Sequence, residues 1–302
     1  MLESLPGRPV LQRVDYPVLE QAGVTLDILR LDGIHPLVGG NKWFKLRLNL
    51  SAAVDAGHDT LLSFGGAYSN HIRSLAAAAR LAGLRSIGVI RGELTDPLNP
   101  VLGFAQAQGM QLVPVTRGDY RRRQDPDFIA SLRNRVGDFY LIPEGGSNEP
   151  GIRGCEDIVD LLLAECRATE PDCGNQSLTV ALACGTGATL AGMVRRRQRL
   201  RLPWQFLGIA VLRDRGFLDD AVATWTGGPS QAWQVNRDYH FGGYARGQVA
   251  LYEFIKDFVE SSGIPLEPVY TGKLLFGICD LVARGNYPPG SRIIGLHTGG
   301  IF

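Results

Sequence analysis

Lysine is scarce in this chain, and two of its lysines stand where they could do chemistry. The chain has only four, at Lys42, Lys45, Lys256 and Lys273, so that 27 of its 31 basic residues are arginines. The first two lie three residues apart, directly behind a Gly-Gly-Asn turn. A lysine amine can form an imine and loses its proton readily when desolvated, whereas arginine does neither. Lys42 is therefore the first candidate for a reactive group.

Three glycine-rich loops each follow a strand-like segment, at the position where ligands collect in parallel sheets. The first loop reads Ser63-Phe64-Gly65-Gly66-Ala67-Tyr68-Ser69-Asn70-His71. Ser69 and Asn70 are natural capping residues, and the backbone amides that open the following helix could bind a carboxylate. An ordinary helix cap without a ligand explains the same residues about equally well.

The second loop, Cys184-Gly185-Thr186-Gly187-Ala188-Thr189, suits a phosphate, because glycine amides form an anion nest and threonine hydroxyls add hydrogen bonds. Tight packing of helix on strand would explain such a turn about as often. A nucleotide-binding oxidoreductase would need an acidic residue roughly twenty residues further on. Trp204-Gln205-Phe206 stands there instead, which counts against that class.

The third loop begins at the end of the last strand-like segment, with His297-Thr298-Gly299-Gly300. The Thr298 hydroxyl could form a hydrogen bond with a heterocycle. Taken by itself, however, this loop is better explained as a simple turn. Together the loops and Lys42 offer an imine-forming amine, a phosphate nest, a carboxylate site and a neutral hydroxyl. Those are the groups that pyridoxal phosphate requires.

Apolar runs of strand length alternate with longer helical patterns, which is typical of a parallel α/β fold. The predicted strands are 24–31, 60–64, 86–90, 111–115, 139–142, 178–183, 206–212 and 292–296. The predicted helices are 42–56, 70–81, 100–108, 128–136, 152–166, 189–197, 249–261 and 274–284. The stretch 226–247 shows no clean period.

Composition excludes several classes of protein. A length of 302 residues favours two lobes, and a net charge of +1 argues against nucleic acid or an anionic membrane as partner. Met1 to Leu11 lacks the apolar stretch of a signal peptide, so we expect a cytoplasmic protein. Five cysteines without CxxC spacing and five dispersed histidines predict reduced thiols and no metal site.

The motifs resemble the tryptophan-synthase-β-like (fold type II) pyridoxal-phosphate enzymes. Within these, the chain looks like the 1-aminocyclopropane-1-carboxylate deaminase / D-cysteine desulfhydrase family. The likeness rests on Gly39-Gly40-Asn41-Lys42, on Ser69-Asn70-His71 and on the run Glu267 to Lys273, which follow the family's order. It implies a two-lobed open parallel-sheet α/β fold with the cofactor in the cleft between the lobes. The larger, cofactor-binding domain would be 1–46 with 148–302, and the smaller 47–147.

The resemblance also implies roles for individual residues. Lys42 would hold the cofactor aldehyde as an imine, and the other cofactor-binding residues would be Lys45, Asn70, Gly185, Thr186, Gly187, Thr189 and Thr298. Lys42, Ser69 and Tyr270 would be catalytic. Substrate would contact Ser69, Asn70, His71, Tyr68 and Tyr244. Two departures from the family pattern are Phe44 in place of an arginine and the lack of a proline after Tyr244.

The family contains more than one activity. Ring-opening deaminases carry a glutamate after the tyrosine that matches Tyr270, whereas desulfhydrases carry threonine, and here Thr271 follows. The expected function is therefore α,β-elimination on a small amino acid, giving pyruvate and ammonia, as in D-cysteine desulfhydrase. The alternatives are 1-aminocyclopropane-1-carboxylate deaminase and a cofactor-binding homologue without turnover. The family further implies a homodimer.

Overall fold

A computed structural model describes residues 7–301, so the first six residues of the N-terminal stretch considered above lie outside it. The chain forms two compact units. The small unit comprises 35–38 and 42–154, and the large unit comprises 7–34, 39–41 and the chain from 155 onward. The chain passes between the units at Ile34–His35, Val38–Gly39, Asn41–Lys42 and Gly154–Cys155. The sequence interpretation placed its domain boundaries after residues 46 and 147.

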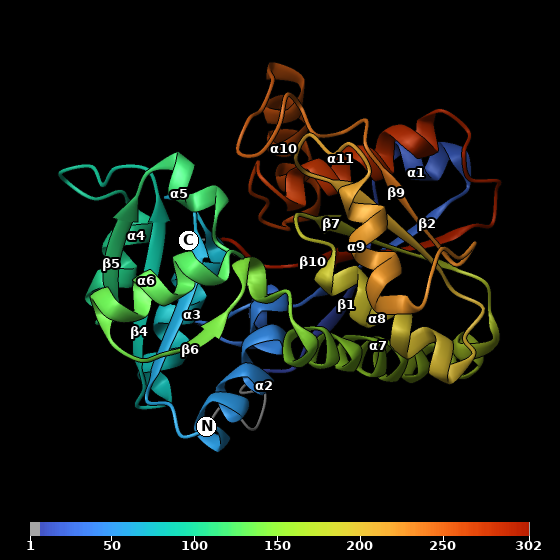
Figure 1. Ribbon diagram of the computed structural model, residues 1–302. Coiled ribbons are helices and arrows are strands. Elements are labelled where there is room, and N and C mark those ends of the chain that lie inside the picture. The colour runs from blue at the N-terminus through green and yellow to red at the C-terminus, as the bar shows by residue number, and fades with distance from the viewer. Residues whose placement is uncertain (1–6, 302) are drawn as a thin grey trace. The chain divides into compact units, whose positions relative to one another are not determined.

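The small unit is built on a four-stranded, fully parallel sheet in the order β5-β4-β3-β6 (Figure 1). Its strands are β3 (Thr60–Gly65), β4 (Arg85–Arg91), β5 (Gln111–Val115) and β6 (Tyr140–Ile142). Its helices are α2 (Asn41–Asp55, whose first residue belongs to the large unit), α3 (Asn70–Leu81), α4 (Pro100–Ala107), α5 (Arg117–Arg121) and α6 (Pro126–Val136). β3 is buried along its whole length, as expected for a central parallel strand.

The large unit has a six-stranded sheet in the order β1-β2-β10-β7-β8-β9, in which only the edge strand β1 is antiparallel to its neighbour. Its strands are β1 (Val10–Val14), β2 (Thr25–Arg30), β7 (Thr179–Cys184), β8 (Gln205–Ala210), β9 (Trp233–Asn236) and β10 (Arg292–His297). Its helices are α1 (Pro17–Ala22), α7 (Glu149–Thr169, whose first turn belongs to the small unit), α8 (Ala188–Leu200), α9 (Phe217–Thr226), α10 (Val249–Ser262) and α11 (Thr271–Ala283).

Apolar packing covers the large sheet on both faces. Helices α1, α10 and α11 lie on one face and α7 and α8 on the other, as Figure 1 shows for this unit. Side chains of α1, α10 and α11, among them Leu19, Phe258 and Ile278, form one buried cluster with Leu26 of β2 and Ile209 of β8. The carboxyl ends of β7 and β10 emerge from this packing and carry the second and third glycine loops.

The predicted α/β class with parallel sheets is confirmed, as are all sixteen predicted elements to within a few residues. The structure adds β1, α1, α5, α9 and β9, which the sequence interpretation missed. β9 lies in the aperiodic stretch 226–247. None of the helices in residues 7–301 combines the length and apolar character that crossing a bilayer requires.

Candidate active site

The turn before Lys42 is held against the end of β10 by an unusually close backbone approach. A Cβ atom on Gly40 would lie 1.9 Å from the carbonyl oxygen of Thr298, and the Gly40 φ is +71°. The Gly40 amide donates to the Leu31 carbonyl oxygen at 2.8 Å. Only glycine combines this conformation with this contact. The second glycine of the Gly-Gly-Asn-Lys run is therefore required by the fold.

Asn41 joins the same turn to the predicted phosphate loop. Its buried Nδ2 donates to Oγ1 of Thr189 at 2.9 Å, across 148 positions of sequence. Thr189 lies in the first turn of α8, whose N-cap residue Gly187 has a φ of +79°. The N-cap residue is a glycine and has no side chain to cap the helix, so backbone amides at this start can bind an anion. Sequence reasoning assigned Asn41 no role, although it directly precedes Lys42.

Lys42 and Lys45 lie on one side of α2, one helical turn apart. Lys42 is half-buried, whereas only 4% of Lys45 is exposed, and the Lys45 Nζ donates to the Gly145 carbonyl at 2.9 Å. One turn further along, Asn49 exchanges side-chain hydrogen bonds with Asn148, at 3.1 and 2.7 Å. The glycine turn after β6 and the start of α7 therefore fix the lysine face of α2.

His71 is buried in the small unit with one ring nitrogen unsatisfied. Its Nε2 lies 2.9 Å from the Ser63 hydroxyl, while Nδ1 has no hydrogen-bond partner among the described residues. Burial lowers the pKa of His71 well below 6.5, and the positive charges of Lys42 and Lys45 lower it further. The ring is therefore neutral, and a buried orphan nitrogen of this kind is suited to a ligand. Ser63, which the sequence interpretation did not single out, sets the ring orientation.

Ser69 is the N-cap of α3, and its hydroxyl accepts a hydrogen bond from the Ile72 amide at 3.3 Å. Asn70 begins the helix at the predicted position. The close packing of Gly65 explains the geometry of this loop, since a Cβ there would lie 2.8 Å from Ser69 Oγ. Tyr68 precedes the cap and is 60% exposed. The small unit thus brings Ser69, Asn70 and His71 together on one helix start.

Tyr270 and Tyr244 form a pair in the large unit. Their hydroxyl oxygens are 3.3 Å apart, and their rings meet edge to face with centroids 6.0 Å apart. The Tyr270 ring also lies 3.6 Å from the position of a Cβ on Gly185, which places it beside the phosphate loop. Both tyrosines were predicted for the site, and Tyr270 sits at the N-cap of α11.

Glu267 organises the turn that carries Tyr270. Its carboxylate accepts hydrogen bonds from the amides of Val269, Tyr270 and Thr271 at 2.7, 2.8 and 2.7 Å. The buried Thr271 hydroxyl lies 3.2 Å from the same carboxylate. Burial raises the pKa of Glu267, although these amide and hydroxyl donors oppose the rise. Sequence reasoning used Glu267 only as part of a motif, because its acceptor role depends on the turn it closes.

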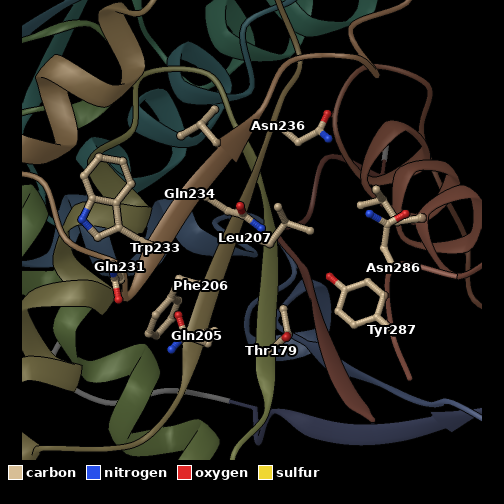
Figure 2. Close-up of a pocket in the computed structure, with 12 residues that line it drawn as sticks. Thr179, Gln205, Phe206, Leu207, Gln231, Trp233, Gln234, Asn236, Asn286 and Tyr287 are labelled. Atoms are coloured by element: carbon tan, nitrogen blue, oxygen red, sulfur yellow. The ribbon is translucent and has the colours of Figure 1, made fainter. Parts of the chain in front are cut away.

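A separate cavity of about 610 Å³ opens in the large unit at the amino ends of β7 and β8 (Figure 2). Thr179 and Gln205 line it from these strands, and Figure 2 shows Asn286 and Tyr287 on the side of the segment that follows α11. None of the predicted site residues lines it. The cavity is therefore distinct from the loops at the carboxyl ends of the strands.

The residues present fit pyridoxal phosphate. The start of α8, with a glycine at its N-cap, has backbone amides and the Thr186 and Thr189 hydroxyls that could bind a phosphate, and the large unit also contains the Thr298 hydroxyl. The small unit contributes an amine at Lys42 and the unsatisfied Nδ1 of His71. Each unit by itself thus contains part of the donor set that this cofactor uses.

Comparison with known proteins agrees with this chemistry. The family model described as "Pyridoxal-phosphate dependent enzyme" matches residues 13–299. A Pyrococcus horikoshii protein named "Putative 1-aminocyclopropane-1-carboxylate deaminase" is 32% identical over 307 residues, covering 99% of this chain and 91% of that protein. The D-cysteine desulfhydrase of Salmonella newport is 28% identical over 289 residues, covering 90% and 86%.

The solved structures point the same way. A crystal structure described as that of an ACC deaminase homologue is similar with a TM-score of 0.82 and 28% identity, covering 99% of this chain and 91% of that one. A hydrogen sulfide-producing enzyme from Fusobacterium nucleatum shares the fold at a TM-score of 0.70 and 12% identity, covering 99% and 97%. This chain belongs to the pyridoxal-phosphate-dependent enzyme family, and its cofactor is pyridoxal phosphate.

The close approach at Gly40 can be tested by stability. We expect Gly40→Ala to lower the free energy of unfolding of the large unit by about 2 kcal/mol more than Gly285→Ala. Gly285 is a matched control, since its φ is +74° and no atom lies within 4 Å of its Cβ position. Urea denaturation followed by tryptophan fluorescence measures both. Equal losses of unfolding free energy in the two variants would show that only the backbone angle matters and that the Thr298 carbonyl does not restrict residue 40.

The neutral state of His71 can be tested by NMR. With ¹³C-labelled histidine, the His71 Cε1 resonance, assigned through His71→Gln, should not titrate between about pH 8 and pH 5.5. Because the folded pKa is depressed, this group favours the folded protein above pH 6.5, and that contribution is lost as pH falls below it. A His71 resonance that titrates near the ordinary histidine pKa would contradict the burial argument.

Proposed function

We propose that this enzyme catalyses α,β-elimination on a small amino acid, releasing pyruvate and ammonia, with D-cysteine as the best candidate substrate. The proposal is supported by the match to a D-cysteine desulfhydrase over 90% of this chain and by Thr271 in place of a glutamate. The observation that carries it is the Asn41–Thr189 hydrogen bond. Through it, the residue that precedes the amine is anchored to the phosphate loop.

In this proposal Lys42 is the catalytic amine. Its Nζ would hold the cofactor, and as a free amine it would take the α-proton of the substrate. Half-burial on α2 suits an amine that must act as a base. Ser69 and the neutral His71 orient the substrate carboxylate, together with Asn70. Lys45, whose ammonium donates to Gly145, would add positive charge for the phosphate.

The large unit supplies the remaining contacts. Gly185, Thr186, Gly187 and Thr189 would hold the phosphate at the start of α8, and Thr298 would hydrogen-bond the pyridine nitrogen. When bound, pyridoxal phosphate supplies an electron sink for the pair left on the substrate α-carbon. Tyr270, paired with Tyr244, would face the leaving group and pass a proton to it.

Ring opening is the second candidate, and the structure gives a reason against it. Deaminases of this family carry a glutamate where Thr271 stands. Here the Thr271 hydroxyl is buried against the Glu267 carboxylate. A second carboxylate at 271 would be buried beside the first, at the cost that unpaired buried charges carry. The local structure therefore favours threonine at this position and with it the desulfhydrase pattern.

The resemblance to the family also supports a homodimer that acts on a small amino acid, and we propose a cytoplasmic location for it. Light scattering on the purified protein measures the oligomeric state directly, and a monomer at micromolar concentration would overturn the dimer.

The role of Lys42 makes a direct prediction. Lys42→Ala should lose the visible absorbance of the cofactor imine and at least about a thousandfold in pyruvate release. Lys256→Ala is the matched control, because its side chain is 77% exposed on α10, and it should retain both properties. A Lys42→Ala protein that keeps the imine spectrum and normal turnover would exclude Lys42 as the reactive amine.

Substrate class can be resolved by a panel assay on the yellow holoenzyme. Pyruvate release should be fastest with D-cysteine and other β-substituted amino acids that carry a leaving group. Release of α-ketobutyrate from 1-aminocyclopropane-1-carboxylate should be slower by about a hundredfold or more. The reverse order would favour a deaminase. A coloured protein that is inert toward every substrate would instead indicate a homologue without turnover.

A further inference from the structure

Lys273 is the most deeply buried charged side chain of α11, and the catalytic scheme above does not use it. Its exposed fraction is 0%. Its Nζ donates to three backbone carbonyl oxygens, those of Val211 at 3.0 Å, His240 at 3.0 Å and Gly243 at 2.9 Å. An ammonium has three N–H donors, so every one of them is used. The side chain is a tethered cation in a cage of carbonyls.

The cage joins two segments that lie apart in the sequence. Val211 directly follows β8, while His240 and Gly243 belong to the loop between β9 and α10. That loop has an unfavourable backbone, because Phe241 and Ala245 have φ values of +50° and +52°. Left-handed conformations are unfavourable for non-glycine residues. The hydrogen bonds from Lys273 therefore help to hold the loop in this conformation.

The next residue after the cage is Tyr244. Its hydroxyl lies 3.3 Å from that of Tyr270, which stands one helical turn before Lys273 on the same element. The first turn of α11 therefore carries both Tyr270 and Lys273, whose ammonium holds the loop that contains Tyr244. Charge supports the arrangement, because the Glu267 carboxylate raises the pKa of Lys273 while burial, the larger effect, lowers it to about 8.

We propose that Lys273 is the positioning residue for the tyrosine pair: its ammonium draws in the carbonyls of the 240–243 turn and thereby sets Tyr244 against Tyr270. The relevance of Lys273 to substrate choice rests on the proposed function, in which this pair lines the substrate site. The placement of Tyr244 by Lys273 does not depend on that function, because it concerns only contacts within the large unit.

The test is spectroscopic and needs no turnover. The holoenzyme is labelled with 3-fluorotyrosine, and the Tyr244 and Tyr270 resonances are assigned by Tyr244→Phe and Tyr270→Phe. In the parent protein, Tyr244→Phe should shift the Tyr270 ¹⁹F resonance. In Lys273→Met, which keeps the length of the stem but not the charge, Tyr270 should already be shifted and should no longer respond to Tyr244→Phe.

Two further variants guard against a merely structural effect. Ile278→Ala removes a fully buried side chain from the same helix and should lower the denaturation midpoint while leaving the Tyr270 resonance in place. If Lys273→Met does not fold, Lys273→Arg is the second variant. It keeps the charge, but its donors are spread over a planar guanidinium and cannot reach three carbonyl oxygens from one nitrogen atom. It should give a shifted Tyr270 resonance with a reduced response to Tyr244→Phe.

A Tyr270 resonance that responds to Tyr244→Phe equally in the parent and in the Lys273 variants would overturn the proposal. Kinetics distinguish its failure from failure of the proposed function. If the elimination is correct and Lys273 positions the pair, Lys273→Met should lower kcat/KM by roughly tenfold to a hundredfold with the imine spectrum intact. If the protein has no eliminase activity, the ¹⁹F result still decides the geometric claim.

Discussion

The arrangement of this protein's chemistry depends on one backbone contact, the approach of Gly40 to the carbonyl of Thr298. That contact places the turn before α2 at the carboxyl end of β10, and the Asn41–Thr189 hydrogen bond then joins the turn to the start of α8. The chain leaves the large unit at the next peptide bond, which leads to Lys42. Lys42, the proposed reactive amine, is thus the first residue after a turn that is attached to the second and the third glycine loops. A rigid attachment of this kind is what a catalytic group needs to act repeatedly on one geometry.

The four lysines illustrate how environment separates chemistry from structure. Lys256 is exposed near Glu260 on the surface of α10 and has the environment of a solvated charge. Lys45 and Lys273 are buried, and backbone carbonyls offset their desolvation. Lys42 alone follows the anchored turn and stays half-buried. The four lysines therefore occupy different environments. Of these, the environment of Lys42 is the one that suits an amine that must exchange covalent partners.

Much of the fold could be predicted from the sequence because the local signals agree. Helix α3 begins and ends as predicted, since Ser69 caps it and Gly83 follows it closely. β9 was missed because an alternation over only four residues is too short to stand out within the aperiodic stretch 226–247, and its strand character comes from pairing with β8. Asn41–Thr189, Ser63–His71 and the Lys273 cage could not be predicted, because each depends on partners that only the folded chain brings into contact. The predicted roles of Lys42 and Tyr270 came from the order of motifs along the chain. That order does not predict the distances between these side chains and their neighbours.

The central claim is that Lys42 is the residue that holds the cofactor. Borohydride reduction of the holoenzyme followed by peptide mass spectrometry tests it most directly, because reduction converts the imine into a stable bond at the lysine that forms it. We expect a single phosphopyridoxyl group on the peptide that contains Lys42, with Lys45, Lys256 and Lys273 unmodified. A label on any of these other lysines, or a yellow protein that acquires no label, would contradict it.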